Sequence, residues 1–177
     1  MANNNWRTPP QIFAYYDDIF DFDYDVAASK DNALCRRFLD EDDNYLSGAH
    51  ASTEFRTGRY NWCNPPYSNP LPFIKQVIND SQEHGIGYVV LLNHDMTTKW
   101  ANLLANINCQ IQVFTGGRIA FLNGEEQAIK GNSKGQIAVI VPPYVRSGKP
   151  ITDYVDLNCV MDNGQVIIDV YKVEVAA

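Results

Sequence analysis

The chain has 177 residues, of which 45% are hydrophobic and 20% are charged. This composition excludes a largely disordered protein, and the length fits one domain. The net charge of −7 argues against a protein that coats nucleic acid non-specifically, since phosphate-binding surfaces are usually basic. It allows an enzyme that holds DNA on one local basic face.

No apolar run approaches the ~18 residues that a membrane-spanning helix needs. Residues 1–6 have neither the basic start nor the apolar segment of a secretory signal. We therefore expect a cytoplasmic protein with no membrane partner.

In the first third of the chain, apolar spacing predicts a helix over residues 9–19, with Thr8 as its N-cap. Residues 20–28 alternate aromatic or β-branched residues with aspartates, which predicts a strand that ends in small residues. A short helix is expected over residues 31–39. A second strand, over 59–63, stops at two prolines.

The central part predicts a helix over residues 70–84 that ends at Gly85, and another over 97–105 with Thr97 as a cap. Strands are expected over 87–92, 110–114 and 135–141. The first and last of these are continuously apolar, as in a parallel sheet that is buried on both faces. The alternation of elements predicts an α/β sheet with helices on both faces.

The C-terminal residues 154–161 and 165–175 flank Asn163-Gly164, a dipeptide typical of hairpin turns. We therefore predict an accessory β-hairpin over residues 150–177. It would follow a catalytic core at 1–149 within the same domain.

A metal site is not indicated. No two of the four cysteines form a C-x-x-C pair, and the three histidines stand in unrelated contexts. We expect reduced thiols and no bound metal.

The most informative segment is Asn64-Pro65-Pro66-Tyr67, which lies where a predicted strand meets a turn. In a parallel α/β sheet, ligands bind at the carboxyl ends of strands. The Asn64 side chain and the Pro65 carbonyl are hydrogen-bond acceptors, and Tyr67 offers a flat aromatic ring. Two acceptors beside a stacking plane suit a planar ring with an amino group, such as a nucleobase drawn out of its helix.

A second segment, residues 20–29, places an acid before small residues at a strand end, where a cofactor could approach the backbone closely. It lacks the glycines of a G-x-G-x-x-G loop, which argues against a dinucleotide. Asp25 would instead suit a cationic or hydroxyl-bearing cofactor. Alternation alone favours a simpler interpretation, in which the aspartates are the solvated face of an edge strand.

Five segments together resemble the small DNA adenine methyltransferases of bacteriophages and prophages, the phage Dam type. In chain order they are Trp6-Arg7-Thr8-Pro9, Phe22-Asp23-Tyr24-Asp25-Val26-Ala27-Ala28-Ser29 with Asn32, Cys35 and Phe38 after it, Asn64-Pro65-Pro66-Tyr67-Ser68, Thr97-Thr98-Lys99-Trp100, and Gly117-Arg118-Ile119-Ala120-Phe121. The ordered set is much more specific than any one motif. It extends from Trp6 to Val141.

The resemblance implies a Rossmann-like fold, abbreviated between Asp25 and Asn64. It also implies methyl transfer from S-adenosylmethionine to the 6-amino group of a flipped-out adenine in double-stranded DNA. The implied catalytic residues are Asn64, Pro65, Pro66 and Tyr67. The implied cofactor residues are Thr8, Pro9, Asp25, Val26, Ala27, Ala28 and Asn64.

The acid that holds the cofactor's ribose is expected among residues 40–43, about 20 residues after the first strand, and we assign it to Asp42. Phosphate contacts are expected from basic residues that the sequence offers on several elements: Arg36, Arg37, Lys99, Arg118, Lys130 and Lys134. The polar residues 132–135 are a candidate DNA-contacting loop.

Two alternatives follow from the residues themselves. The same acceptors would suit another amine, that of cytosine or of a protein glutamine. The charge of −7 would also fit a non-enzymatic acidic protein that mimics DNA.

Overall fold

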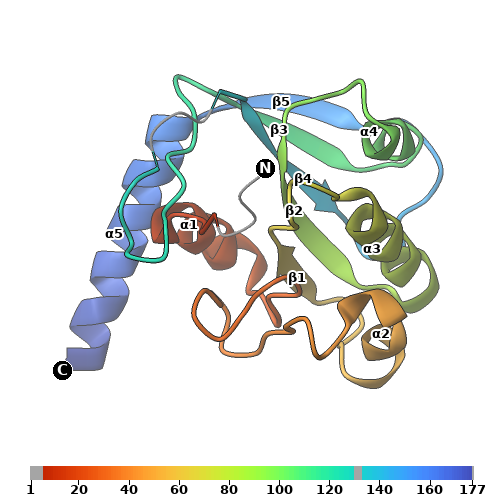
Figure 1. The fold of residues 1–177 in the computed structure, drawn as a ribbon, viewed down its shortest axis with the longest axis horizontal. Helices are drawn as coiled ribbons and strands as arrows, with labels where there is room; N and C mark the ends of the chain where they lie inside the picture. The colour runs from red at the N-terminus through yellow and green to blue at the C-terminus, as the bar shows by residue number, and fades with distance from the viewer. Residues whose placement is uncertain (1–5, 130–132, 177) are drawn as a thin grey trace.

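The computed structural model describes residues 6–129 and 133–176. A five-stranded sheet with the order β1-β2-β4-β3-β5 forms its centre (Figure 1). The strands are β1 Tyr60–Cys63, β2 Gly87–Asn93, β3 Gln110–Thr115, β4 Gln136–Val141 and β5 Ile151–Asp156.

Four strands run in one direction, and β4 runs against both of its neighbours. The predicted α/β class is confirmed. The expectation that residues 135–141 form a parallel strand is wrong: β4 is apolar because helices cover both of its faces, and that burial does not depend on strand direction.

Helices cover both faces of the sheet (Figure 1). One face carries α1 Pro10–Phe20 and α5 Leu157–Ala176, and the other carries η1 Tyr45–Ser47, α2 Ala49–Thr53, α3 Leu71–His84 and α4 Lys99–Leu104. The pleat of β2 shows the division, since Val89 and Leu91 pack toward α1 while Val90 and Leu92 pack toward α3 and α4. In the described part of the chain, no helix is both long and apolar enough to cross a membrane.

The predicted strand over residues 20–28 is wrong in its extent. Phe20 is still the last residue of α1, where its ring packs at 4.7 Å from that of Tyr60. Asp21 then turns the chain with a φ of 50°, in the left-handed region. Alternation of apolar and acidic residues therefore did not separate the helix end from the extended segment that follows.

The extended segment is centred on Asp25, which makes isolated parallel bridges to Trp62 of β1 and to Phe38. The Asp25 N–H donates to the Arg37 carbonyl at 3.0 Å, and the Leu39 N–H donates to the Asp25 carbonyl at 2.9 Å. The sheet thus continues beyond β1 through very short pairings. This agrees with the abbreviation that the family resemblance implied.

No helix forms over residues 31–39, so that prediction is wrong. The chain wraps around the Asp25 side chain instead, and the Leu34 N–H donates to Asp25 Oδ2 at 3.3 Å. A local turn precedes it, in which the Asn32 side chain accepts from the Ser29 N–H at 2.6 Å. Backbone N–H groups that donate to side chains in this way cannot also form the hydrogen bonds of a helix.

The other helix ends differ from prediction by one or two residues. Pro9, rather than Thr8, precedes α1, and no side chain caps it. Helix α3 ends at Gly85 as predicted, with a φ of 66°. Thr98, rather than Thr97, caps α4.

The predicted C-terminal hairpin is wrong, because β5 is followed directly by the long helix α5. Gly164 lies inside α5, where an added Cβ would come within 1.9 Å of the Gln11 carbonyl oxygen of α1. The Gln11 side chain also donates to Gln165 at 2.9 Å. Gly164 therefore allows α1 and α5 to approach each other closely. From the sequence alone, a glycine needed for close helix packing looks the same as a glycine of a hairpin turn.

We expect Gly164→Ala to destabilise the protein by about 1–3 kcal/mol, because overpacking outweighs the better helix propensity of alanine. Urea unfolding measures the change. Asn163→Ala, at the exposed neighbouring position of α5, is the matched control and should be neutral or slightly stabilising. A stabilised Gly164→Ala variant would contradict the close approach of α1 and α5.

Candidate active site

Two adjoining cavities lie at the carboxyl ends of β1 and of the Asp25 segment. The larger has a volume of about 530 Å³, within the range of small-molecule sites. Its walls include residues 26–29, Phe73 and three consecutive acids, Asp40, Glu41 and Asp42. The smaller, of about 50 Å³, is lined by Trp6, Thr8, Asp25, Trp62 and Asn64 among others. Ala27, Asn32 and Pro66 line both.

Asn64 follows the last residue of β1 and faces the smaller cavity. Its side-chain nitrogen donates a long hydrogen bond, 3.5 Å, to the Trp6 carbonyl. Its side-chain oxygen is buried and accepts no hydrogen bond from the described residues. The contact with Trp6 thus orients the amide so that an acceptor is left for a ligand.

The segment around Trp6 is fixed from two sides. Arg7 and Leu122 exchange backbone hydrogen bonds at 2.9 Å in both directions. The Trp6 ring stacks on Phe121 at 5.3 Å and meets Tyr67 edge-on at 6.1 Å. These contacts hold the Trp6 carbonyl in place beside Asn64.

Tyr67 lies in this aromatic cluster, with its ring also edge-on to Phe121 at 5.6 Å. Its hydroxyl is buried without a partner among the described residues, and burial raises its pKa. Tyr67 and Pro65 line neither of the two cavities, whereas Asn64 and Pro66 do. The ring that we expected to stack on a base is thus edge-packed, and its stacking role stays a prediction.

Asp25 is 3% exposed and lines the smaller cavity. Its carboxylate accepts from the Ala27 N–H at 3.4 Å and from the Leu34 N–H at 3.3 Å. Burial outweighs these two bonds and raises the Asp25 pKa to about 6. Asp25 has no cationic partner among the described residues, and a buried carboxylate of this kind is electrostatically suited to a cationic ligand.

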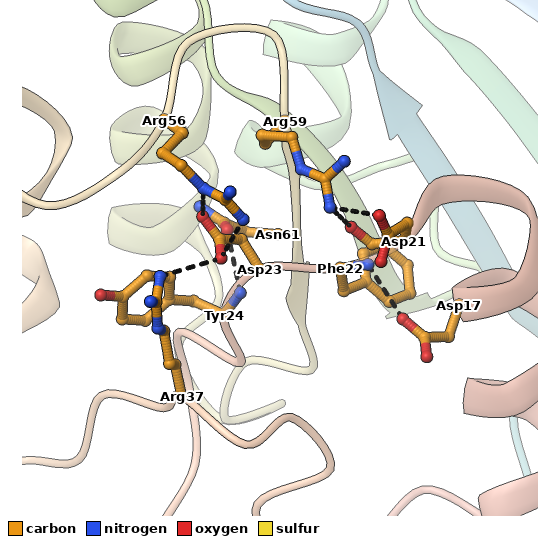
Figure 2. Close-up of polar contacts among 9 residues, drawn as sticks. All are labelled: Asp17, Asp21, Phe22, Asp23, Tyr24, Arg37, Arg56, Arg59 and Asn61. Atoms are coloured by element: carbon orange, nitrogen blue, oxygen red, sulfur yellow. Dashed lines mark hydrogen bonds and ion pairs between the residues drawn. The ribbon is translucent and has the colours of Figure 1, made fainter.

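The neighbouring Asp21 and Asp23 form ion pairs (Figure 2), and neither lines a cavity. Asp23 accepts two hydrogen bonds from Arg56, both at 2.8 Å, and one from Arg37 at 3.2 Å. The hydrogen bond from Arg56 is the main reason that the pKa of Asp23 is lowered. Asp21 is paired with Arg59. The aspartates of residues 21–25 are therefore not simply a solvated strand face, since Asp21 and Asp23 form ion pairs. They are not all cofactor residues either, because only Asp25 lines a cavity.

The predicted cofactor residues come together with one exception. Val26, Ala27, Ala28 and Asp42 line the larger cavity, and Thr8, Asp25, Ala27 and Asn64 line the smaller one. Pro9 lines neither, because it is buried at the start of α1. Sequence reasoning did not assign Asn32 and Phe73 to the site. The Ser29-x-x-Asn32 spacing of a side-chain turn was the available signal for Asn32.

The predicted DNA contacts lie in two groups. Lys99, Arg118 and Lys134 are exposed around the edge at which β1, β2 and β3 end, and Lys134 pairs with Asp95 at 3.4 Å. Arg36 and Arg37 precede Phe38, which pairs with Asp25 on the side away from β1. The Arg37 guanidinium is 5.7 Å from the Tyr24 ring. Lys130 and Asn132 lie outside the described residues. Within the described residues, no cluster of three or more histidine, cysteine or acidic side chains could hold a metal.

A ligand-sized cavity at the carboxyl ends of strands is typical of α/β enzymes that bind a small molecule there, and its extension holds an acid and an acceptor amide that no described donor satisfies. Comparison with known proteins makes the family specific. The model of the DNA N-6-adenine-methyltransferase (Dam) family matches residues 1–167.

Two curated phage proteins, each named DNA N-6-adenine-methyltransferase, are similar to the chain. The one from Haemophilus phage HP1 (strain HP1c1) is 35% identical over 164 residues, which cover 91% of each chain. The one from Escherichia phage T1 is 28% identical over 172 residues, which cover 88% of this chain and 69% of the phage protein. The chain belongs to the Dam family of DNA N-6-adenine-methyltransferases, which confirms the resemblance found in its sequence.

Asp25 predicts a specific pH dependence of stability. Its pKa is about 6 in the folded protein against 3.8 ordinarily, so the folded state binds more protons between these values. The free energy of unfolding should therefore fall as pH rises from about 4 to about 6, by up to about 3 kcal/mol from this group. Asp25→Asn should remove that component.

Urea unfolding of both proteins from pH 4 to pH 8 makes the comparison. The difference between the two unfolding free energies should favour Asp25→Asn increasingly up to about pH 6 and then level off. A pH-independent difference would show that Asp25 ionises normally.

Proposed function

We propose that this protein transfers a methyl group from S-adenosylmethionine to the 6-amino group of adenine in double-stranded DNA. Family membership supports the reaction, and the two cavities support the arrangement of its components. The single observation that carries the catalytic assignment is the buried Asn64 oxygen, which no described donor satisfies. An acceptor left unpaired at a strand end is what an incoming amine requires.

The residues fit the cofactor. The larger cavity would hold the adenosine part, with the exposed carboxylate of Asp42 toward the ribose hydroxyls. Asp40 is less suited, because its Oδ1 already accepts from the backbone N–H groups of Asp42 and Asp43. The methionine part would extend past Ala27 into the smaller cavity, near Asp25.

When bound, S-adenosylmethionine supplies a methyl group that its sulfonium already activates, so the protein needs to orient and desolvate the acceptor amine. The adenine amine is a weak nucleophile because its lone pair is delocalised into the ring. Asn64 Oδ1 and the Pro65 carbonyl would accept its two hydrogens and favour the pyramidal amine that attacks. Asp25 would provide negative potential on the cofactor side.

The alternatives differ in their support. A DNA mimic loses its basis, because the chain belongs to an enzyme family and Asp21 and Asp23 form internal ion pairs. Cytosine and glutamine amines would contact Asn64 in the same way. The product analysis below distinguishes them.

We expect Asn64→Ala to lower turnover by about 10²–10³-fold, the effect of removing one preorganised electrostatic partner. Cofactor affinity should change little, because the bond forms mainly in the transition state. Asn64→Asp should retain some activity, since it keeps an acceptor. Labelled methyl transfer to DNA, followed by nucleoside analysis, measures turnover and identifies N6-methyladenine.

Asn69→Ala is the matched control, because Asn69 is exposed in the same loop. It should methylate DNA at the parent rate. Parent activity in folded Asn64→Ala would remove Asn64 from the catalytic role, and a product other than N6-methyladenine would overturn the substrate assignment.

DNA binding should depend steeply on salt despite the net negative charge, because contact is confined to a local basic face. Lys99→Glu and Lys134→Glu should each weaken binding, with a smaller salt dependence, since both lysines are at the edge that carries Asn64. Lys75→Glu makes the same charge change on an exposed residue of α3 and should have less effect. Equal effects of all three would indicate only a general charge contribution.

A further inference from the structure

Asp80 is a fully buried carboxylate of α3 that lines neither cavity. It accepts three side-chain hydrogen bonds, from the Tyr45 hydroxyl at 3.1 Å, the Tyr88 hydroxyl at 2.7 Å and the Gln76 amide at 2.6 Å. Both hydroxyls bond to the same oxygen, Oδ2. Burying a carboxylate is costly even when it is hydrogen-bonded, and these three partners offset part of that cost.

Two of the three hydrogen-bond partners of Asp80, Tyr45 and Gln76, lie at or next to the wall of the larger cavity. Tyr45 begins η1, is 4% exposed and lines that cavity. Gln76 lies against Gly48, at the other end of η1, where an added Cβ would be 3.0 Å from its side-chain nitrogen. Asp80 of α3 thus hydrogen-bonds to the first residue of η1, and Gln76 of α3 lies close to the glycine that follows η1.

The segment immediately before η1 is the acidic loop, residues 40–44, which supplies Asp40, Glu41, Asp42 and Asn44 to the cavity wall. Within the loop, Asp40 Oδ1 accepts from the backbone N–H groups of Asp42 and Asp43, and Asp43 Oδ2 accepts from the Asp40 N–H at 2.9 Å. Asn44 ends the loop with a φ of 51°, in the left-handed region that asparagine adopts more readily than most residues. These hydrogen bonds order the turn itself, so contacts from outside the loop are needed only to fix where the turn lies against the cavity; one of them is His50 Nε2, 2.8 Å from the Asp43 carbonyl oxygen.

The acidic loop is held at both ends. At its start, the Leu39 N–H donates to the Asp25 carbonyl at 2.9 Å. At its end, Tyr45 is anchored on Asp80. The first anchor involves Asp25, which lines the smaller cavity, whereas the second comes from α3, which contributes Phe73 to the larger cavity.

We propose that Asp80 is a positioning residue for the cofactor, which acts through Tyr45 to fix the acidic loop as the ribose-side wall of the larger cavity. This inference rests on the proposed function, because it takes that cavity to be the S-adenosylmethionine site. It predicts that the hydrogen bond of Tyr45, but not that of Tyr88, matters for cofactor affinity. Tyr88 lies in β2 and lines neither cavity.

Tyr45→Phe and Tyr88→Phe are matched variants, since each removes one hydroxyl from the same Asp80 oxygen and keeps the ring. Titration calorimetry with S-adenosylmethionine should show a Kd raised about fivefold to tenfold in Tyr45→Phe, the scale of one lost hydrogen bond. Tyr88→Phe should bind like the parent. Turnover at saturating cofactor should fall much less than affinity in Tyr45→Phe.

Hydrogen–deuterium exchange without cofactor adds a second measurement, in which residues 40–48 should exchange faster in Tyr45→Phe than in Tyr88→Phe. Equal affinities and equal exchange in the two variants would overturn the positioning role and leave Asp80 a structural residue. A parent protein that binds no S-adenosylmethionine would instead overturn the proposed function, and the inference with it. Comparing the two hydroxyls avoids dependence on Asp80→Asn, which would disturb the whole buried cluster.

Discussion

The backbone pairing of Asp25 is the constraint on which the rest of the site depends. Asp25 is bridged to Trp62 on one side and to Phe38 on the other, so its side chain cannot turn away toward solvent. The pairing to Trp62 aligns this segment with β1, the strand that ends just before Asn64. The pairing to Phe38 fixes the position of the chain just before the acidic loop, residues 40–44. One extended residue thus sets the relative positions of the groups that line the two cavities.

Much of the site could be predicted because its residues are contiguous in sequence. Asn64-Pro65-Pro66 follows a strand that two prolines must end, and Val26-Ala27-Ala28 follows an acid at a sheet edge; neither inference needed a distant contact. In the structure, Asn64, Pro66 and residues 25–28 line the two adjoining cavities. Arg37 lines neither cavity and forms an ion pair with Asp23 instead. No local sequence pattern indicates that these two residues are close together.

The fold predictions failed where tertiary contacts outweigh local pattern. Asn163-Gly164 favours a turn locally, but the packing of α5 on α1 requires a residue without a Cβ at that point. Residues 31–39 have helical spacing, but the Asp25 carboxylate captures the Leu34 N–H. In both cases the deciding partner is far along the chain or belongs to another element.

The region around Asn64 also concentrates unsatisfied polar atoms. Thr8 Oγ1, Trp62 Nε1, Asn64 Oδ1 and the Tyr67 hydroxyl are all buried without a partner among the described residues. Each such atom costs about 1–3 kcal/mol. Stability is thus lowered at the place where preorganised polar groups would be most useful to a reaction.

The reversed direction of β4 has an evolutionary consequence. In a fully parallel sheet, the connection that enters each strand arrives at the amino edge, away from the ligands. Because β4 is antiparallel, β3 ends and β4 begins at the edge that carries Asn64, and the described residues between these two strands include Arg118, Phe121 and Lys134. Insertions or deletions in this segment could diversify the surface around Asn64 while leaving the strands beneath it unchanged. A short chain could in this way vary its substrate contacts without acquiring another domain.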